Sequence, residues 1–424
     1  MLAGSAVAGR ALAGGAAAFA LAVALAAAGC SASAGGQSAT RAKAAAAKAT
    51  VTILPADGAR EVRPGAGVTV RAENGHVKKV VVSTTGGVIR QVPGALNASR
   101  SAWRSATPLV PSQSYTVVAT AVSAGGQKVT ASSSFRTLTP RKTAHVSVLE
   151  SNNQAYGVGM PITLTFSGKV TNRKAIERAL SVTTSKPVIG AWYWDRTWDG
   201  NTTVSFRPKS YWTPGTKVSF TGHINGLEVA KGVYATRDLH VHFHIGPSLI
   251  ARVSTRTHYM KIYYKGRLFG HWPISTGRPG DDTPNGRYLT IEKANPTFMK
   301  GPGYALWVPW AVRFTWSGVY IHDAYWSVAE QGVVNVSHGC VNTSPAHAER
   351  YYKMELPGDP VIVTGSPRAG TWNDGWTQWF LPFSKYVHGS ALHQAVSAGP
   401  HGSTFIDAST VEPPPIGLRG HRLT

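Results

Sequence analysis

Two residues with nucleophile and base chemistry lie near each other in the C-terminal half of this chain. Cys340 lies within Ser337-His338-Gly339-Cys340-Val341-Asn342, and His322 ends an apolar run upstream of it. A thiol next to an imidazole that can take its proton is a nucleophile for acyl transfer. The alternative is an inert buried thiol, but polar residues and a glycine surround Cys340 instead of an apolar stripe. The pattern favours a catalytic cysteine.

Strands on both sides of this pair must position it. Strands are expected at residues 249–253, 259–264, 267–274, 287–291 and 360–364, with a tight hairpin turn at Lys265-Gly266, and a helix is expected at 345–354. Residues 299–310 are rich in Gly, Pro and aromatic side chains. Because long loops in compact domains usually serve a function, we predict that this segment is a mobile lid.

The residues before this region carry the pattern of two further domains. In residues 51–140, short runs such as 114–119 alternate apolar and polar positions, and Pro, Gly and Asn break them about every ten residues. Residues 141–247 repeat the plan and add a short helix at 173–180. This spacing is typical of immunoglobulin-like β-sandwiches, here without a disulfide. The predicted fold class is mainly β.

The start of the chain indicates export. Residues 1–29 contain one charge, an apolar run and small residues before Cys30, and they resemble a bacterial lipoprotein signal peptide. The resemblance implies that Cys30 is lipidated and becomes the mature N-terminus. An uncleaved membrane anchor is the alternative. Residues 30–50 are rich in Ala, Ser, Gly and Lys and predict a flexible tether. The expected location is extracytoplasmic, on the outer face of the cytoplasmic membrane.

The charge balance narrows the possible partners. The chain has 43 Lys and Arg against 20 Asp and Glu, a formal net charge of +23. Such a chain attracts polyanions. An exported lipoprotein does not meet nucleic acid, so the expected partners are anionic cell-wall polymers and the membrane that its lipid anchor enters. The alternative is that the charge only keeps the protein soluble.

Several motifs together resemble the L,D-transpeptidases, whose catalytic domain is of the YkuD type. The motif around Cys340 follows Ile321-His322, and Ile274-Ser275-Thr276-Gly277, Thr283-Pro284-Asn285-Gly286 and residues 358–363 match other family elements. The resemblance covers residues 248–365. We expect a Trp-rich C-terminal subdomain at 366–400 and a disordered tail at 401–424. A papain-like cysteine hydrolase would use the same Cys/His pair, but the local sequence that surrounds the nucleophile in that family is absent from this chain.

The resemblance implies a role for each candidate site residue. Cys340 is the nucleophile and His322 the base, oriented through the backbone carbonyl of Asp323, while His338 is the rival base. The backbone N–H groups of His338, Gly339 and Cys340 are the candidate oxyanion hole. The expected substrate-binding residues are Tyr304, Trp326, Ser337, Asn342 and Asp323. Of these, Ser337 and Asn342 are expected mainly to fix the loop. Trp316 is a further candidate for the channel wall.

The implied activity is cross-linking of peptidoglycan stem peptides, in 3→3 links, through an acyl-enzyme on Cys340 with release of D-alanine. A cysteine hydrolase acting as an L,D-carboxypeptidase, and a non-enzymatic wall-binding lipoprotein, are the alternatives. No cofactor and no metal is predicted. His240, His242 and His244 alternate on one expected strand face, where two of them could share zinc, but no acidic or cysteine partner follows at ligand spacing.

Overall fold

The computed structural model describes residues 47–85, 91–197, 199–301 and 303–411. Strands make up 48% of the structure and helices 10%, which confirms the predicted mainly β fold class. The predicted signal peptide, Cys30, most of the predicted tether and residues 412–424 lie outside the described residues. Among the described helices, none combines the length and the apolar character that a membrane crossing requires.

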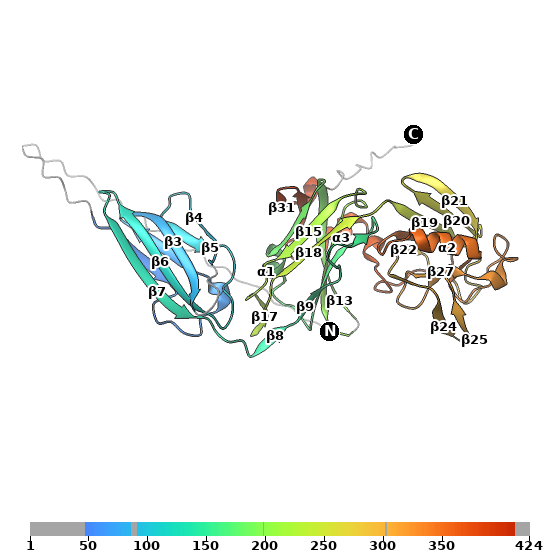
Figure 1. The fold of residues 1–424 in the computed structure, drawn as a ribbon, viewed down its shortest axis with the longest axis horizontal. Helices are drawn as coiled ribbons and strands as arrows, with labels where there is room; N and C mark the ends of the chain where they lie inside the picture. Colours follow the sequence, from blue (N-terminus) through green and yellow to red (C-terminus); the bar gives the residue numbers. More distant parts are fainter. Residues whose placement is uncertain (1–46, 86–90, 198, 302, 412–424) are drawn as a thin grey trace, which may run out of the picture. The chain divides into compact units, whose positions relative to one another are not determined.

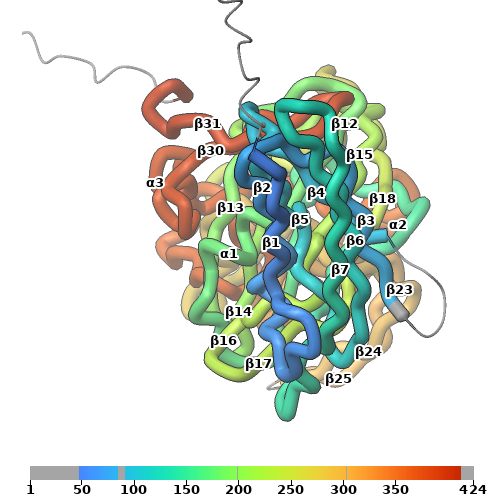
Figure 2. The backbone as a smooth tube through the Cα atoms, turned by 90° about the vertical axis from the view of Figure 1, so that its left-hand side faces the viewer, coloured from blue at the N-terminus to red at the C-terminus, as the bar shows by residue number. Residues whose placement is uncertain are grey.

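The first domain is a β-sandwich of two sheets, one in the order β1-β2-β5-β4 and one in the order β3-β6-β7 (Figures 1 and 2). Its elements are β1 (Thr50–Leu54), η1 (Pro64–Ala66), β2 (Thr69–Glu73), β3 (Gly75–Thr85), β4 (Gly94–Leu96), β5 (Ala102–Ser105), β6 (Ser114–Ser123) and β7 (Lys128–Arg136). Side chains of β6 alternate between core and surface, and Tyr115, Val117 and Ala119 are buried. This alternation is the one that the sequence predicted.

The second domain is also a sandwich, with one sheet in the order β10-β18-β15-β12. Its elements are β8 (Lys142–Ala144), β9 (Val146–Val148), β10 (Ala155–Tyr156), β11 (Ile162–Phe166), α1 (Arg173–Arg178), β12 (Leu180–Thr184), β13 (Val188–Arg196), β14 (Thr202–Pro208), β15 (Lys217–Gly222), β16 (Glu228–Ala230), β17 (Val233–Ala235) and β18 (Leu239–Ile245). Its core is rich in aromatic side chains, among them Trp192 and Phe206, whose ring centres lie 5.4 Å apart.

The other sheet of this domain takes two strands from the C-terminal end of the chain. Its order is β31-β30-β13-β14-β11-β9, and β30 (Gln394–Gly399) pairs antiparallel with β13 through Val188 and Ala398 (Figure 2). Thus β31 (Gly402–Asp407), followed by η4 (Ala408–Thr410), lies where the sequence predicted a disordered tail, and that prediction is wrong for these residues. The segment predicted as a separate Trp-rich subdomain instead completes a sheet.

Arg207 of β14 anchors the segment that leads to these strands, which includes η3 (Gln378–Phe380) and α3 (Phe383–His388). Its side chain is 1% exposed. The guanidinium donates to the carbonyl oxygens of Gln378 at 3.1 Å and Leu381 at 2.8 Å, and it lies 4.4 Å from the ring centre of Trp379. A buried cation is stabilised by such acceptors and by aromatic faces. This arrangement explains why the Trp-rich segment returns to the second domain.

The catalytic segment contains two sheets, β21-β20-β19-β29-β22 and β23-β26-β27-β28, and the hairpin β24-β25. Its elements are β19 (Leu249–Ser254), β20 (Tyr259–Tyr264), β21 (Arg267–Pro273), β22 (Gly286–Leu289), β23 (Glu292–Ala294), β24 (Thr297–Gly301), β25 (Tyr304–Val308), β26 (Ala311–Arg313), β27 (Tyr320–Asp323), η2 (Tyr325–Ser327), β28 (Val341–Thr343), α2 (Pro345–Met354) and β29 (Pro360–Thr364). The predicted strands and helix are confirmed.

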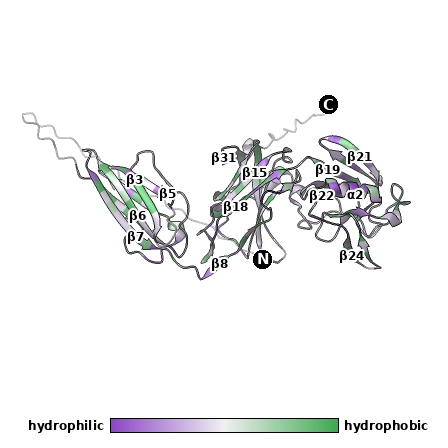
Figure 3. Ribbon diagram, in the orientation of Figure 1, coloured by the Kyte–Doolittle hydropathy of each residue, from purple (hydrophilic) through white to green (hydrophobic). Residues whose placement is uncertain are grey.

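Local sequence accounts for several of these elements. Lys265 and Gly266 both have positive φ, 51° and 79°, as a two-residue hairpin turn requires. At the start of α2, Pro345 takes the first helical position and the Ser344 hydroxyl accepts from the N–H of His347. In Figure 3 this helix is largely hydrophilic in colour, whereas hydrophobic colour runs along strands such as β6.

Candidate active site

His322 and the cysteine motif come from two neighbouring parallel strands. In the register of β27 and β28, His322 lies opposite Asn342, and Cys340 directly precedes the first residue of β28. Because side chains two residues apart along an extended chain point to the same side, Cys340 and Asn342 face the side on which His322 lies. The fold therefore brings the predicted nucleophile and base to the end of one sheet.

His322 is held in one orientation. Its side chain is 4% exposed, and Nδ1 lies 2.7 Å from the carbonyl oxygen of Asp323. Since that oxygen can only accept, Nδ1 carries the hydrogen and Nε2 keeps its lone pair. Burial lowers the pKa of His322 to about 4, although the bond to Asp323 acts in the opposite direction. At neutral pH the imidazole is uncharged and Nε2 can accept a proton.

The Cys340 thiol is protonated at rest. Burial raises its pKa to about 11, and the backbone at Tyr320 offsets only part of this shift. Sγ lies 3.7 Å from the carbonyl oxygen of Gly318. Burial of the two groups disfavours a resting pair of ions, so the thiol and the imidazole are both neutral before substrate binds.

The loop that carries Cys340 is closed by Ser337. The Ser337 hydroxyl donates to the carbonyl oxygen of Cys340 at 2.7 Å and accepts from the N–H of Gly339 at 3.1 Å. Gly339 has a φ of 118°, a conformation that favours glycine. Its N–H is thus already engaged, which corrects its predicted place in the oxyanion hole. Among the described residues, the N–H groups of His338 and Cys340 have no hydrogen-bond partner, so they are the open donors.

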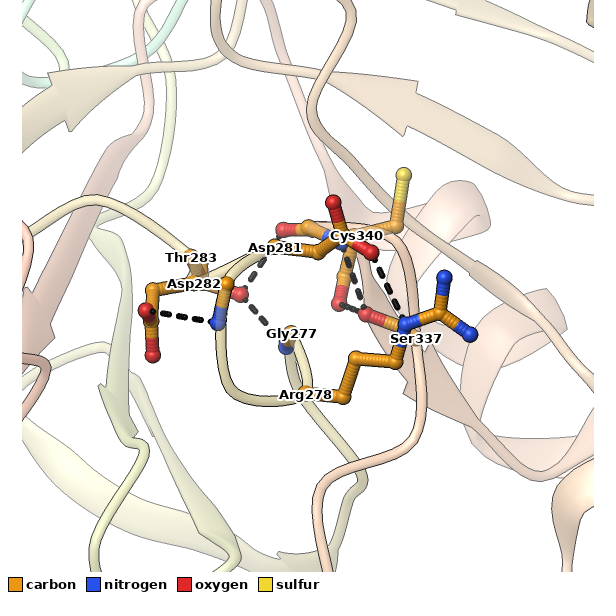
Figure 4. Close-up of polar contacts among 9 residues, drawn as sticks. Gly277, Arg278, Asp281, Asp282, Thr283, Ser337 and Cys340 are labelled. Atoms are coloured by element: carbon orange, nitrogen blue, oxygen red, sulfur yellow. Dashed lines mark hydrogen bonds and ion pairs between the residues drawn. The ribbon is translucent and has the colours of Figure 1, made fainter. Parts of the chain in front are cut away.

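Thr283 braces the same loop from the preceding long turn. Its hydroxyl donates to the carbonyl oxygen of Gly339 at 2.7 Å and accepts from the N–H of Gly277 at 2.9 Å. Figure 4 shows Thr283 between Gly277 and the loop of Cys340. In addition, Ser275 and Asn342 exchange two backbone hydrogen bonds, at 3.1 and 2.8 Å. Sequence reasoning noted the motif around Thr283 but assigned no role to this residue.

A cavity of about 330 Å³ opens beside these groups. Its lining combines the motif residues with the hairpin and the turn after β27, namely Met299, Tyr304, Leu306, Val308, His322, Trp326, Ser327, Glu330, Val336, Ser337, His338, Cys340 and Asn342. The Tyr304 ring centre lies 4.7 Å from that of His338, and the Trp326 ring centre lies 6.0 Å from that of His322. Nucleophile, base and open N–H donors therefore line one space, which is the arrangement that acyl transfer requires.

Comparison with known proteins gives a consistent result. The family model of the L,D-transpeptidase catalytic domain matches residues 248–363, and the family model of a bacterial Ig domain matches residues 59–228. L,D-transpeptidase 5 of Mycobacterium tuberculosis H37Rv is 32% identical over 350 residues, which cover 81% of this chain and 77% of the relative. The chain belongs to the L,D-transpeptidase family.

One further relative and one solved structure, both from M. tuberculosis, are similar to this L,D-transpeptidase. L,D-transpeptidase 2 of strain CDC 1551 is 32% identical over 347 residues, which cover 78% of this chain and 83% of the relative. The crystal structure of an L,D-transpeptidase from strain H37Rv is 33% identical, covers 51% of this chain and 96% of that chain, and has a TM-score of 0.43.

Three predictions about the surroundings of the site need correction. The predicted lid loop is a two-stranded hairpin, β24-β25, in which Thr297 pairs with Val308. Asp323 does not line the cavity. Its side chain is buried, and only its carbonyl oxygen serves His322. Trp316 also lies away from this cavity and lines another one with Trp372 and Trp376. Tyr304, Trp326, Ser337 and Asn342 do lie at the cavity, as predicted.

Glu330 is a cavity residue that sequence reasoning missed. It lies three residues beyond η2, in a turn that the sequence pattern does not distinguish from any surface turn. Only the fold brings this turn against the motif of Cys340. The one signal available in the sequence was an acid close to the motif in a chain with few acids.

The histidines of β18 form no comparable site. Their side chains alternate outward, His240 Nδ1 lies 3.2 Å from the Thr221 hydroxyl, and His242 Nε2 lies 2.7 Å from Oδ1 of Asn153. Within the part of the chain that the structure describes, no group of three or more His, Cys, Asp or Glu side chains is arranged to hold a metal ion.

Proposed function

We propose that this L,D-transpeptidase cross-links peptidoglycan by forming 3→3 links between stem peptides, with Cys340 as nucleophile and His322 as base. The observation that carries the proposal is the fixed imidazole of His322, whose Nδ1 donates to Asp323 and whose Nε2 is left as an acceptor in the cavity that Cys340 also lines. A neutral imidazole with a fixed tautomer is suited to take a thiol proton during attack.

In the acylation step, the Cys340 thiol turns from the carbonyl of Gly318 and gives its proton to Nε2 of His322. Sγ bonds to the carbonyl carbon between the diamino acid and the terminal D-alanine of a tetrapeptide stem. The N–H groups of His338 and Cys340 stabilise the oxyanion. The tetrahedral intermediate then breaks its C–N bond, the D-alanine nitrogen takes the proton from His322, and a thioester remains on Cys340.

In the second step an amine of another stem attacks the thioester carbon. His322 takes one proton from that amine and returns it to the sulfur as the C–S bond breaks. The products are a new amide between the two stems and the free thiol. Water in place of the amine would give hydrolysis, and the reaction would then be that of an L,D-carboxypeptidase.

Mass spectrometry of the intact protein and its products tests this proposal. After incubation with a tetrapeptide muropeptide, the account expects D-alanine release, a thioester on Cys340 and a cross-linked dimer. Release of D-alanine without a dimer, at any concentration of acceptor, would favour the carboxypeptidase. An adduct on a residue other than Cys340 would contradict the mechanism.

Carbapenems should react with the same sulfur atom of Cys340. These compounds present a strained acyl group, so attack by Cys340 opens the ring and leaves a covalent adduct on sulfur. Peptide mapping after incubation should locate the added mass on Cys340 in the wild type and find none in Cys340→Ala.

We also propose that the protein acts outside the cytoplasmic membrane, held there by lipid on Cys30 and attracted to anionic wall polymers by its positive charge. The support is the apolar run before Ala27-Ala28-Gly29-Cys30 and the net charge of +23. Cys30→Ser produced in a related host should lose metabolic lipid labelling. Labelling that persists, or a mature protein that starts elsewhere, would overturn the anchor.

A further inference from the structure

The half-buried Glu330 places its carboxylate at the catalytic cavity. It lines the cavity together with Cys340, and its Oε2 is buried without a hydrogen-bond partner among the described residues. Its backbone, in contrast, has a structural use, because its carbonyl oxygen accepts from the N–H groups of Val333 and Val334 at 3.0 and 2.9 Å. The main chain of Glu330 therefore makes hydrogen bonds that stabilise the turn, whereas Oε2 of its side chain makes none with the described residues.

Glu177 shows how the fold satisfies a buried glutamate in this protein, whereas buried carboxylate oxygens of Asp323, Glu355 and Asp359 have no hydrogen-bond partner among the described residues and lie outside the cavity. Glu177 accepts hydrogen bonds from Nε1 of Trp194 at 2.9 Å and from the N–H of Ala391 at 2.8 Å. Buried carboxylates usually have such partners, because leaving one unpaired is costly. A buried carboxylate oxygen with no partner inside a ligand cavity indicates that the partner arrives with the ligand.

The charge of the cavity wall specifies what that partner is. Among the described residues that line the cavity, Glu330 is the only acidic one and none is Lys or Arg, and the imidazole of His322 is neutral. This holds in a chain whose formal net charge is +23. The surroundings thus favour a cationic ligand group over an anionic one. Apolar side chains of Met299, Leu306 and Val336 form other parts of the same wall and suit a chain of methylenes.

We propose that Glu330 binds the free ammonium group of the diamino acid in a stem peptide and so determines which stems react. A methylene chain that ends in an ammonium group matches the apolar wall and the single carboxylate. The inference rests on the proposed function, which supplies the diamino acid. The ammonium group can belong to the donor stem, before its carbonyl is attacked, or to the acceptor stem, in which case it gives one proton to the Glu330 carboxylate and becomes the neutral amine that attacks the thioester. The chemistry of recognition is the same in both.

The first test compares a donor stem that has its free amine with the same stem N-acetylated at that amine. In the wild type, kcat/KM for D-alanine release should be about 10- to 100-fold higher with the free amine, the range that a charged hydrogen bond provides. In Glu330→Gln this ratio should fall close to one. Glu349→Gln removes the same charge from α2, where Glu349 pairs with Lys353, and should keep the wild-type ratio.

The acceptor is tested separately by mixing a preformed acyl-enzyme with an acceptor stem. If the acceptor supplies the ammonium group, Glu330→Gln should form the thioester at the wild-type rate and should lose about 10-fold or more in the ratio of aminolysis to hydrolysis. Mapping of a carbapenem adduct to Cys340 verifies that the variant is folded. The inference is overturned if Glu330→Gln changes neither the ratio of kcat/KM between free-amine and acetylated donors nor the ratio of aminolysis to hydrolysis.

Binding separates a failure of this inference from a failure of the proposed function. In a Cys340→Ala background, calorimetric titration with the stem tetrapeptide should give tighter binding for the free amine than for the acetylated form. Glu330→Gln in that background should remove the difference. If the free amine binds more tightly through Glu330 but the wild type shows no turnover, the cross-linking function is refuted and the ammonium site is retained. If the wild type turns over stems at a rate that depends neither on the free amine nor on Glu330, the cross-linking function is retained and the ammonium site is refuted.

Discussion

The cavity beside Cys340 and the outer face of β18 both carry histidines, and they differ in what surrounds the rings. His322 is 4% exposed, and its Nδ1 is bound to the carbonyl of Asp323. His240, His242 and His244 are exposed on β18, and the rings of His240 and His242 contact the Thr221 hydroxyl and the Asn153 amide oxygen of neighbouring segments. The β18 face has more imidazoles, yet only the cavity has a nucleophile.

The comparison teaches that burial and orientation make a histidine a base. In the cavity, burial keeps His322 uncharged and one hydrogen bond selects its tautomer. On β18, solvent competes for each ring and no thiol or carboxyl group completes a site among the described residues. His338 lies between these cases, because it is exposed but contacts Tyr304 at the cavity. Four predictions test this contrast.

Removal of the nucleophile should have the largest effect. Cys340→Ala should abolish both D-alanine release and the carbapenem adduct, because Cys340 is the only thiol among the described residues that line the cavity. The checks are turnover of a tetrapeptide muropeptide and intact mass. A residual rate near that of the wild type would show that the chemistry belongs to another residue.

Acylation should hardly change between pH 7 and pH 5. His322 is the base when neutral, and its pKa is lowered to about 4, so the rate should rise with pH through about 4 and then level off. A histidine with the ordinary pKa of about 6.5 would lose most of its activity by pH 5. In the unfolded state the pKa of His322 is about 6.5, so between pH 6.5 and pH 4 the unfolded state binds more protons than the folded state. The free energy of unfolding should therefore decrease as the pH falls from about 6.5 to about 4. Circular dichroism at each pH therefore accompanies the rates.

Loss of the Thr283 brace should have a moderate effect. Thr283→Val removes the hydroxyl that joins Gly277 to Gly339 and leaves two buried backbone groups unpaired. We expect a loss of about 1–3 kcal/mol in stability and a lower acylation rate, since the open N–H groups would be held less firmly. Chemical denaturation and acylation kinetics measure the two effects. Thr364→Val, at the end of β29, serves as a matched control for the substitution.

Loss of the β18 histidines should have the smallest effect. The triple variant His240→Ala, His242→Ala and His244→Ala should keep acylation within about twofold and stability within about 1 kcal/mol, as is usual for exposed positions. Zinc should also leave the melting temperature of the wild type unchanged. A large zinc-dependent rise in the wild type alone would show that this face is a metal site.

Local patterns predicted much of the catalytic segment. α2 and β29 have the predicted bounds, because a proline and a serine cap mark the start of the helix and a run of β-branched residues forms the strand. The positions of Cys340 and His322 followed from the motif. These features depend on residues that are neighbours in the sequence, so the sequence contains the information that specifies them.

Long-range pairing accounts for most of what was missed. The strand β30 contains small residues and little alternation, and its partner β13 is far away in the sequence, so no local signal marked it. The approach of Glu330 to Cys340 likewise depends on tertiary structure. The bond from Gly339 to Ser337 is local, but it depends on a loop conformation in which Gly339 has a positive φ. The raised pKa of Cys340 also depends on the fold, because burial of the thiol outweighs the effect of its backbone partner.

The most direct test of the central claim is the rate of acylation, by stopped-flow, of His322→Ala and His338→Ala under the same conditions. The account predicts that His322→Ala loses about 10²–10⁴-fold, the usual contribution of a general base, and that His338→Ala loses much less. Near-wild-type melting temperatures for both variants would confine the difference to chemistry. A greater loss in His338→Ala than in His322→Ala would contradict the assignment of His322 as the base.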